Sequence, residues 1–228
     1  MATIGIVAGS GPDAGIDLWT KLLAATRHQL GDEYTGDADA PRVVIVSEPE
    51  LGRSMELEQY EAEVWAALER TVRQLDPQVD HYAIACNTLH HFAPRLGDLG
   101  LGAHLVSAID VSRAHVRGHG LETVGLMGAR PVVDLGPWSP YRPLGDDTKV
   151  VTAGLGTELH QLIHDVKTHG PGHPGLADTW AEIVADTPAD TILLACTELP
   201  LLPAPVTDKD LVDVTDLIAE ELARLART

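Results

Sequence analysis

The sequence predicts an α/β protein of two similar lobes, each a mostly parallel sheet flanked by helices. Short runs rich in aliphatic and β-branched residues alternate with longer amphipathic segments along the 228 residues. The apolar runs at 43–46 and 192–195 show no alternation with polar residues, which is typical of strands covered on both faces. Finally, an Ala-Cys pair ends two of these runs, at 85–86 and 195–196, and this repetition indicates two related units.

The expected elements follow from the period of the apolar residues. Segment 55–75 is a clear helix candidate, because Val64, Leu68, Val72 and Leu75 recur near helical spacing with charged residues between them. The candidate strands are 3–9, 42–47, 81–86, 103–107, 123–128, 149–153, 191–196 and 210–214, and the candidate helices are 13–30, 55–75, 88–96, 109–118, 155–168, 175–186 and 214–227.

The repeated strand and cysteine divide the chain into two lobes. We expect a first lobe of residues 1–106 plus 207–228 and a second lobe of residues 107–206, with one cysteine in each. The last helix has no lobe of its own and is expected to pack on the first. Two stretches rich in turn formers, 128–147 and 169–175, are expected to be surface connections.

Composition argues against several classes of protein. The formal net charge is −18, from 34 acidic and 16 basic side chains, which argues against a nucleic acid or an anionic membrane as partner. No segment approaches the roughly 20 uninterrupted apolar residues that span a bilayer. The N-terminal stretch lacks the features of a signal peptide, so a cytoplasmic location is expected. The two cysteines are then expected to be free thiols.

Each cysteine stands where a strand passes into a polar turn. Cys86 is followed by Asn-Thr and Cys196 by Thr-Glu, and the ends of parallel strands are where ligands bind in open α/β sheets. A helix starting at such a turn would lower the pKa of the thiol through its N–H groups and dipole. The alternative is that each cysteine is a small buried hydrophobe. The matched settings favour a reactive pair.

These two segments resemble the signature segments of the aspartate/glutamate racemase family. The first reads ACNT-x-H and the second ACTELPLL, whereas glutamate racemases typically read CTHYPLL, so the chain is similar to the aspartate-racemase branch. The resemblance covers nearly the whole chain in the right order. The matching segments are 4–15, 47–54, 85–90, 124–133, 195–202 and 213–226.

The resemblance implies an amino-acid racemase that uses no metal and no organic cofactor, with aspartate or glutamate as the first expected substrate. It also implies a homodimer and an active site in the cleft between the lobes. Inverting a stereocentre by proton transfer needs a base on one face of the α-carbon and an acid on the other. Cys86 and Cys196 are the expected acid/base pair, one as thiolate and one as thiol, because the reference pKa of cysteine, about 8.5, is readily moved toward neutrality.

The residues expected to bind the substrate surround the two cysteines. Asn87, Thr88 and Thr197 match the substrate-binding positions of the family and can donate hydrogen bonds to the carboxylate, where negative charge builds up. Arg53 is the candidate to hold a side-chain carboxylate, with a solvated loop arginine as the alternative. Glu198 could orient a thiol partner or accept the ammonium group, or be only a first-turn carboxylate. The full expected set is Ser10, Arg53, Asn87, Thr88, Thr197 and Glu198.

Departures from the family pattern leave the substrate open. Ala8, Ser10 and Gly15 differ from the residues typical of the glycine-rich turn, and Ile218 replaces a histidine of the closing helix. Arg130 stands where the family has a Thr-rich turn and is a candidate additional anion anchor. The alternatives are a maleate-type cis-trans isomerase, a malonate decarboxylase relative, or a non-catalytic homologue that binds a ligand or senses redox state.

Eleven histidines raise the question of a metal site. His160 and His164 have the i, i+4 spacing that places two ligands on one helix face. No glutamate follows His160 as in zinc proteases, and no third ligand has suitable spacing, so no metal site is predicted. His90 matches the family's motif histidine and is expected to support the turn at Cys86, while His91 has no assigned role.

Overall fold

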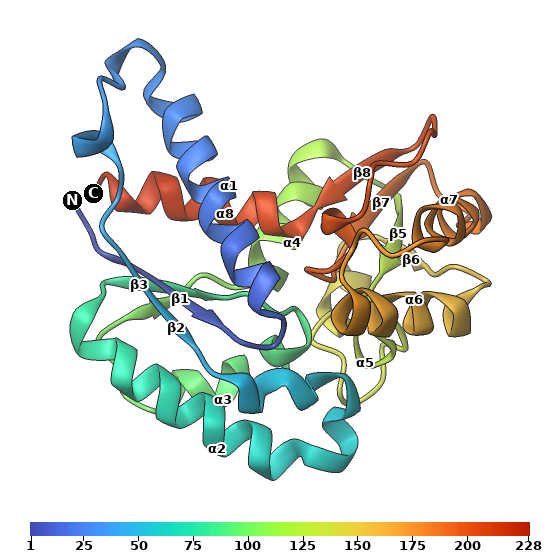
Figure 1. Cartoon of the computed structure of the whole chain (residues 1–228), viewed down its shortest axis with the longest axis horizontal. Helices are drawn as coiled ribbons and strands as arrows, with labels where there is room; N and C mark the ends of the chain where they lie inside the picture. The colour runs from blue at the N-terminus through green and yellow to red at the C-terminus, as the bar shows by residue number, and fades with distance from the viewer.

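The computed structural model describes residues 1–228 and contains two four-stranded parallel sheets, one in each lobe (Figure 1). The strand orders, β2-β1-β3-β4 and β6-β5-β7-β8, are equivalent, so the two lobes are built alike. This confirms the predicted fold class, and each expected strand is present. The strands are β1 (Ile4–Ala8), β2 (Val43–Ser47), β3 (His81–Ile84), β4 (His104–Leu105), β5 (Thr123–Met127), β6 (Lys149–Val151), β7 (Thr191–Leu194) and β8 (Asp210–Asp213).

Helices cover both faces of the first sheet. Successive side chains of a strand point to opposite faces, so each strand packs against both layers of helices. Ile4 and Ile6 of β1 pack in the cluster that contains α1 and α8, whereas Val7 packs in the cluster that contains α2. Figure 1 shows α1 and α8 above the strands and α2 below them. The bounds of these helices are Pro12–Leu30 for α1, Leu57–Leu75 for α2 and Val214–Ala226 for α8.

The two lobes share part of their core. Met127 and Leu194 of the second sheet pack against α6 and α7, while their neighbours Leu126 and Leu193 face the other way. Those two residues join α1, α4 and α8 in one cluster of 26 buried residues that runs through both lobes. The remaining helices of this region are α4 (Ala108–His119), α6 (Gly156–His169) and α7 (Leu176–Asp186).

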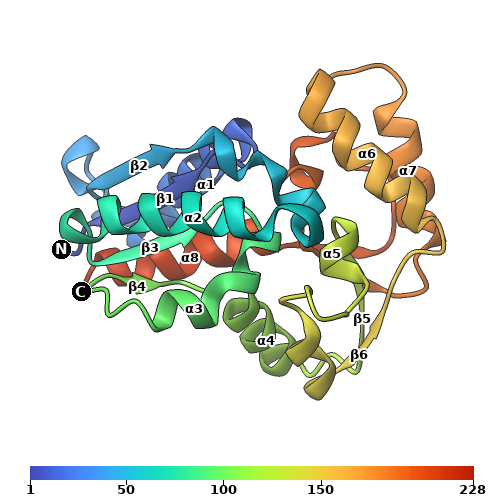
Figure 2. The ribbon, with the colours of Figure 1, turned by 90° about the horizontal axis from the view of Figure 1, so that it is seen from below.

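Strand β8 belongs to the second sheet, where it pairs with β7. Of residues 207–228, which are expected in the first lobe, strand β8 therefore lies in the second sheet. Only α8, which follows β8 directly, returns to the first lobe and packs along α1, as expected. Both termini consequently lie at the same end of the first lobe (Figure 2).

Two expected helices and one expected loop differ in detail. The helix expected at 55–75 is preceded by a 3-10 helix at Pro49–Glu56, and its backbone is non-helical at Tyr60. The helix expected at 88–96 is a 3-10 helix at Thr88–Phe92 followed by α3 (Ala93–Gly97). The expected loop 128–147 contains α5 (Arg130–Val133) and a 3-10 turn. That 3-10 turn is Arg142–Asp146, and further 3-10 turns cover Gly31–Glu33, Asp37–Asp39, Asp76–Gln78 and Leu199–Leu201.

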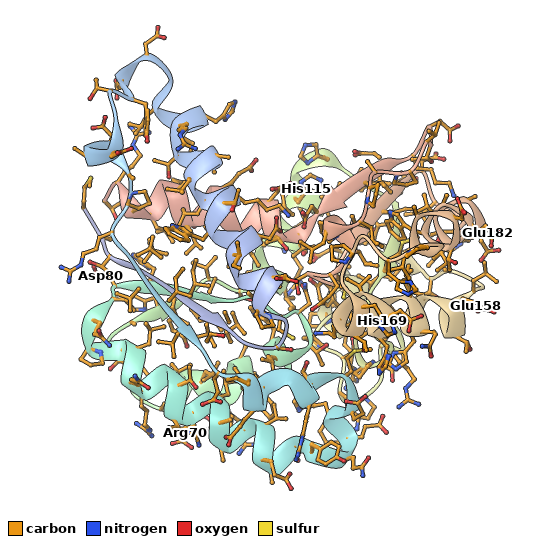
Figure 3. The ribbon with its side chains drawn as sticks, viewed as in Figure 1. Arg70, Asp80, His115, Glu158, His169 and Glu182 are labelled. Atoms are coloured by element: carbon orange, nitrogen blue, oxygen red, sulfur yellow. The ribbon has the colours of Figure 1, made fainter.

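Charged side chains lie on the outer surfaces of both lobes. Glu158 and Glu182 point outward from α6 and α7, and Arg70 points outward from α2 (Figure 3). Arg70 bonds Glu48 and Glu50, but exposed ion pairs of this kind contribute only about 0–1 kcal/mol. None of the helices combines the length and the apolar character needed to cross a bilayer.

Candidate active site

The two cysteines meet at one cavity between the lobes. Cys86 lies two residues beyond the end of β3 and Cys196 two residues beyond the end of β7, and both are buried. The open volume of the cavity is about 10 Å³, which is room for a single water molecule. This closed arrangement must open to admit an amino acid. The cavity is lined by Ser54, Met55, Cys86, Asn87, Thr88, Ala129, Ile163, Lys167, Ala195, Cys196, Thr197 and Glu198.

Hydroxyl groups surround the Cys86 thiol. The Ser10 Oγ donates to Cys86 Sγ at 3.2 Å, and Cys86 Sγ donates to Ser54 Oγ at 3.5 Å. Ser10 is held in place by the turn between β1 and α1, where Gly9 and Gly11 have φ angles of +111° and +123°. A Cβ at Gly9 would lie 2.2 Å from the Glu48 carbonyl oxygen, so only glycine fits there. Ser10 therefore contacts the Cys86 thiol but does not line the cavity.

A carboxylate faces the Cys196 thiol. Cys196 Sγ donates to Glu198 Oε2 at 3.2 Å, and Thr197 Oγ1 donates to the same oxygen at 3.2 Å. Burial raises the pKa of the Cys196 thiol well above its usual value, and the negative charge of Glu198 raises it further. Our expectation of a lowered pKa is wrong for this thiol. The element after Cys196 is the short 3-10 turn at Leu199–Leu201, and its weak dipole does not offset burial.

Lys167 joins the two lobes at this cavity and is not among the residues predicted from the sequence. Its Nζ donates to the Ser10 carbonyl oxygen at 2.5 Å and forms an ion pair with Glu198 Oε1 at 2.7 Å. Burial lowers the pKa of Lys167, but the charge of Glu198, the hydrogen bond to Glu198 and the two nearby cysteines together outweigh burial, so the pKa is raised and the amine stays protonated. Figure 3 labels His169, two residues further along α6, at the end of this helix nearest the first lobe. The sequence signal that could have identified Lys167 is its spacing, because Leu159, Ile163 and Lys167 recur every four residues on the inward-facing side of α6.

Potential hydrogen-bond donors to a carboxylate follow each cysteine. The side chains of Asn87, Thr88 and Thr197 are buried and line the cavity, as expected. The backbone N–H groups of Asn87 and Thr197 donate to no backbone carbonyl, so they are available to a ligand. The Tyr141 hydroxyl, from the loop after α5, donates to Asn87 Oδ1 at 2.6 Å across the lobes. This bond directs the Asn87 oxygen to Tyr141 and leaves its NH₂ group free to donate.

Two predicted anion-binding residues lie away from the cavity. Arg53 is exposed, and its guanidinium lies 4.8 Å from the centre of the Tyr60 ring, so the structure does not bring it to the cysteines. Arg130 is also exposed and does not line the cavity. The carboxylate-binding charge nearest the thiols is therefore that of Lys167, not of either arginine.

The histidines have structural surroundings. His90 is fully buried, and its Nδ1 accepts from the N–H of Ala108 at the start of α4. His91, which had no assigned role, packs against the rings of Phe92 and Trp138, each 5.1 Å away between centroids. No three side chains among His, Cys, Asp and Glu cluster as metal ligands would.

Two departures from the family pattern are in direct contact with each other. A Cβ on Gly15 would lie 2.4 Å from the Cβ of Ala8, so a side chain at 8 requires its absence at 15. Ile218 is buried in the apolar core shared by the lobes. These departures are explained by packing.

The fold and site define a two-lobed α/β protein with paired thiols at the interlobe cavity. The sequence matches the Asp/Glu/Hydantoin racemase family over residues 7–222, and the chain therefore belongs to this family.

Solved structures with the same fold include racemases. The aspartate racemase of Picrophilus torridus superposes with a TM-score of 0.80 at 23% identity, covering 99% of this chain and 94% of that one. A putative Asp/Glu racemase from Yersinia pestis gives 0.77 at 17% identity and covers 100% of both chains. The glutamate racemase of Thermus thermophilus, in complex with β-chloro-D-alanine, gives 0.63 at 20% identity, covering 99% of this chain and 80% of that one.

Proposed function

We propose that this protein is an amino-acid racemase of the aspartate/glutamate type, which works without pyridoxal phosphate and uses Cys86 and Cys196 as its two acid/base groups. One observation carries the proposal. Two thiols, delivered by equivalent strands of two lobes, line the same small cavity. Membership of the racemase family supports the class of reaction.

In the proposed reaction, one cysteine acts as thiolate and removes the α-proton, and the electron pair remains on the α-carbon. The other cysteine, as thiol, then delivers its proton to the opposite face. The product leaves with inverted configuration and the two cysteines have exchanged protonation states, so the reverse reaction uses the same groups.

The charge that develops on the substrate carboxylate needs hydrogen-bond donors aimed at it. The N–H groups of Asn87 and Thr197, one beside each cysteine, together with the Asn87 NH₂, supply donors in a site closed to bulk water. Lys167 is the only lysine or arginine that lines the cavity, and we propose that its ammonium group helps to balance the substrate's negative charge. An acidic amino acid is the first candidate substrate, because the names of the structural relatives specify aspartate and glutamate.

Deuterium incorporation tests this function directly. The protein is incubated in heavy water with a panel of free L- and D-amino acids, and the α-deuterium content and optical rotation are followed. The expected result is incorporation with inversion for one class of amino acid. Cys86→Ser and Cys196→Ser are each expected to abolish racemisation, and near-wild-type inversion by either variant contradicts the two-cysteine mechanism.

We also propose that the protein forms a homodimer. Ile16 and Trp19, one helical turn apart on α1, are 61% and 43% exposed, and a second copy packed on this face of α1 would bury them. Sedimentation velocity at micromolar concentration is expected to give twice the chain mass of 24.3 kDa. A monomer at these concentrations contradicts the proposal.

A further inference from the structure

Three side chains from separate segments form a buried triangle around one of the two thiols. Ser10 comes from the turn after β1, Ser54 from the 3-10 helix Pro49–Glu56, and Cys86 from the turn after β3. The two serines are each 1% exposed. Their Oγ atoms lie 2.6 Å apart, and the sulfur of Cys86 lies 3.2 Å from Ser10 Oγ and 3.5 Å from Ser54 Oγ. Each group is therefore within hydrogen-bond reach of the other two.

We propose that Ser10 and Ser54 are positioning residues for Cys86, a hydroxyl pair whose O–H groups rotate to hydrogen-bond this sulfur both as thiol and as thiolate. The inference rests on the proposed function, in which Cys86 must take up and release a proton in every catalytic cycle. It changes the expected role of Ser10, which acts through Cys86 and not on the substrate.

Counting donors and acceptors shows that the triangle satisfies both states of the sulfur. In the thiol state, Ser10 donates to Cys86, Cys86 donates to Ser54, and Ser54 donates to Ser10, so that a closed ring uses each proton once. When Cys86 loses its proton, Ser10 continues to donate to the sulfur. The Ser54 hydroxyl is then free to rotate and donate to the sulfur as well. Neither state leaves a buried hydroxyl without a partner, and neither requires a backbone movement.

The second thiol has a different partner, and the contrast supports the proposal. The Glu198 carboxylate has only acceptor oxygens when ionised, so it hydrogen-bonds Cys196 only while that residue carries its proton, and the one donor to this sulfur is the backbone N–H of Glu198. A thiolate at Cys196 would face a carboxylate at 3.2 Å, which is unfavourable. Lys167, the remaining titratable group that lines the cavity, bonds Glu198 and the Ser10 carbonyl and makes no hydrogen bond to either sulfur. Hydroxyl donors to a sulfur are therefore present at Cys86 alone.

The consequence is an unequal pair in the resting protein. With hydroxyl donors on one sulfur and a carboxylate on the other, a negative charge is stabilised at Cys86 and opposed at Cys196. The enantiomer whose α-proton faces Cys86 then meets a base ready for proton removal. The opposite enantiomer must wait for the proton to move from Cys196 to Cys86.

Thiolate absorbance near 240 nm tests the proposal without activity as the readout. Cys86 is the only thiol in the Cys196→Ser variant, and a protein lacking both thiols gives the tyrosine background. Adding Ser10→Ala or Ser54→Ala is expected to move the midpoint of thiolate formation to higher pH by about one to two units, because each substitution removes a hydrogen bond to the charged form of the sulfur. Ser54→Thr, which keeps the hydroxyl, is the matched control and is expected to leave the midpoint near its starting value. An unchanged midpoint in both alanine variants, with native circular dichroism, overturns the proposal.

Alkylation of the unmodified protein gives a second measurement that needs no variant. Brief treatment with iodoacetamide at neutral pH, followed by peptide mass spectrometry, is expected to label Cys86 well before Cys196. The reverse order overturns the proposal.

Deuterium incorporation by the wild-type protein distinguishes failure of the hydroxyl-pair proposal from failure of the proposed racemase function. If inversion occurs while the midpoint of thiolate formation is unchanged in both alanine variants, the proposal for the two serines fails and the racemase function stands. If no amino acid exchanges while the midpoint shifts as expected, the function fails and the effect of the serines on Cys86 stands.

Discussion

Replacing Lys167 by methionine is expected to destabilise the folded protein mainly by leaving a charge unpaired. The Lys167 ammonium lies 2.7 Å from Glu198 Oε1, and the side chains of the two residues are 19% and 6% exposed. Methionine has nearly the same length and apolar stem, so packing along α6 is largely kept. The Glu198 carboxylate, however, would be buried beside Cys196 without its cation.

The expected loss follows from the burial of this pair. Removing one partner of a buried ion pair costs about 3–5 kcal/mol, far more than the same change at the surface. The Ser10 carbonyl also loses its Lys167 donor, and an unsatisfied buried acceptor costs about 1–3 kcal/mol. The 19% exposure of Lys167 admits some water, so we expect a total loss of about 3 kcal/mol at pH 8.

The pH dependence has a definite sign. The raised pKa of Lys167 means that its contribution to stability is present below its ordinary pKa of 10.5 and is lost only as the pH rises through the higher folded-state value. The difference in stability between wild type and Lys167→Met is therefore expected to be constant from pH 8 to pH 10 and to shrink at higher pH.

Urea unfolding followed by circular dichroism measures both effects. The set of proteins is wild type, Lys167→Met, Glu198→Gln and the double variant, with the exposed Lys149→Met as the matched control, expected within about 0.5 kcal/mol of wild type. The double variant should be more stable than the sum of the two single losses indicates, with a coupling energy of about 2 kcal/mol. A loss below about 1 kcal/mol for Lys167→Met at pH 8, or additive single losses, refutes the reasoning.

Two further predictions concern buried side chains beside the cysteine turn. Burial lowers the pKa of His90 to about 4, below its ordinary value of 6.5, so the stability it contributes is present above pH 6.5 and is lost as the pH falls toward 4. The difference between these two pKa values corresponds to a stability change of up to about 3 kcal/mol. His90→Gln should therefore flatten the decline in melting temperature between pH 6.5 and pH 4, and an unchanged slope contradicts the lowered pKa of His90. Tyr141→Phe removes the hydrogen bond to Asn87 and should raise KM more than it lowers kcat, with a stability loss of about 1–3 kcal/mol. Tyr34→Phe, whose hydroxyl has no hydrogen-bond partner in the chain, is the control, and equal effects of the two substitutions contradict a role for Tyr141 in orienting Asn87.

The fold and the paired thiols could be predicted from local patterns. The unbroken apolar run 192–195 predicts a strand covered on both faces, and the structure confirms it, whereas the run 43–46 forms the edge strand β2 and is only partly covered, with Ile45 39% exposed. The Ala-Cys ends at 86 and 196 are a short-range signal that does not depend on the partner strand. The position of Asn87, Thr88 and Thr197 beside those thiols followed from chain connectivity alone, since residues adjacent in sequence must be adjacent in space.

What surrounds the thiols was decided by the tertiary structure. Ser54 and Lys167 reach the cavity from 32 and 81 residues away from Cys86, and no local pattern encodes which side chain of a helix end points across an interlobe boundary. For the same reason the sequence could not show that Arg53 lies away from the cavity. Its neighbour Ser54 contacts the Cys86 thiol, whereas the Arg53 side chain packs on Tyr60.

The expected low pKa of the thiols shows most clearly which properties depend on the local sequence and which depend on the tertiary structure. The sequence by itself determined that each cysteine ends a central strand and begins a polar turn. Whether such a thiol is favoured as an anion depends on burial, on the length of the helix that follows and on the charge of groups brought from other segments. These are properties of the packed chain, and at Cys196 burial and the Glu198 carboxylate outweigh a 3-10 turn of three residues.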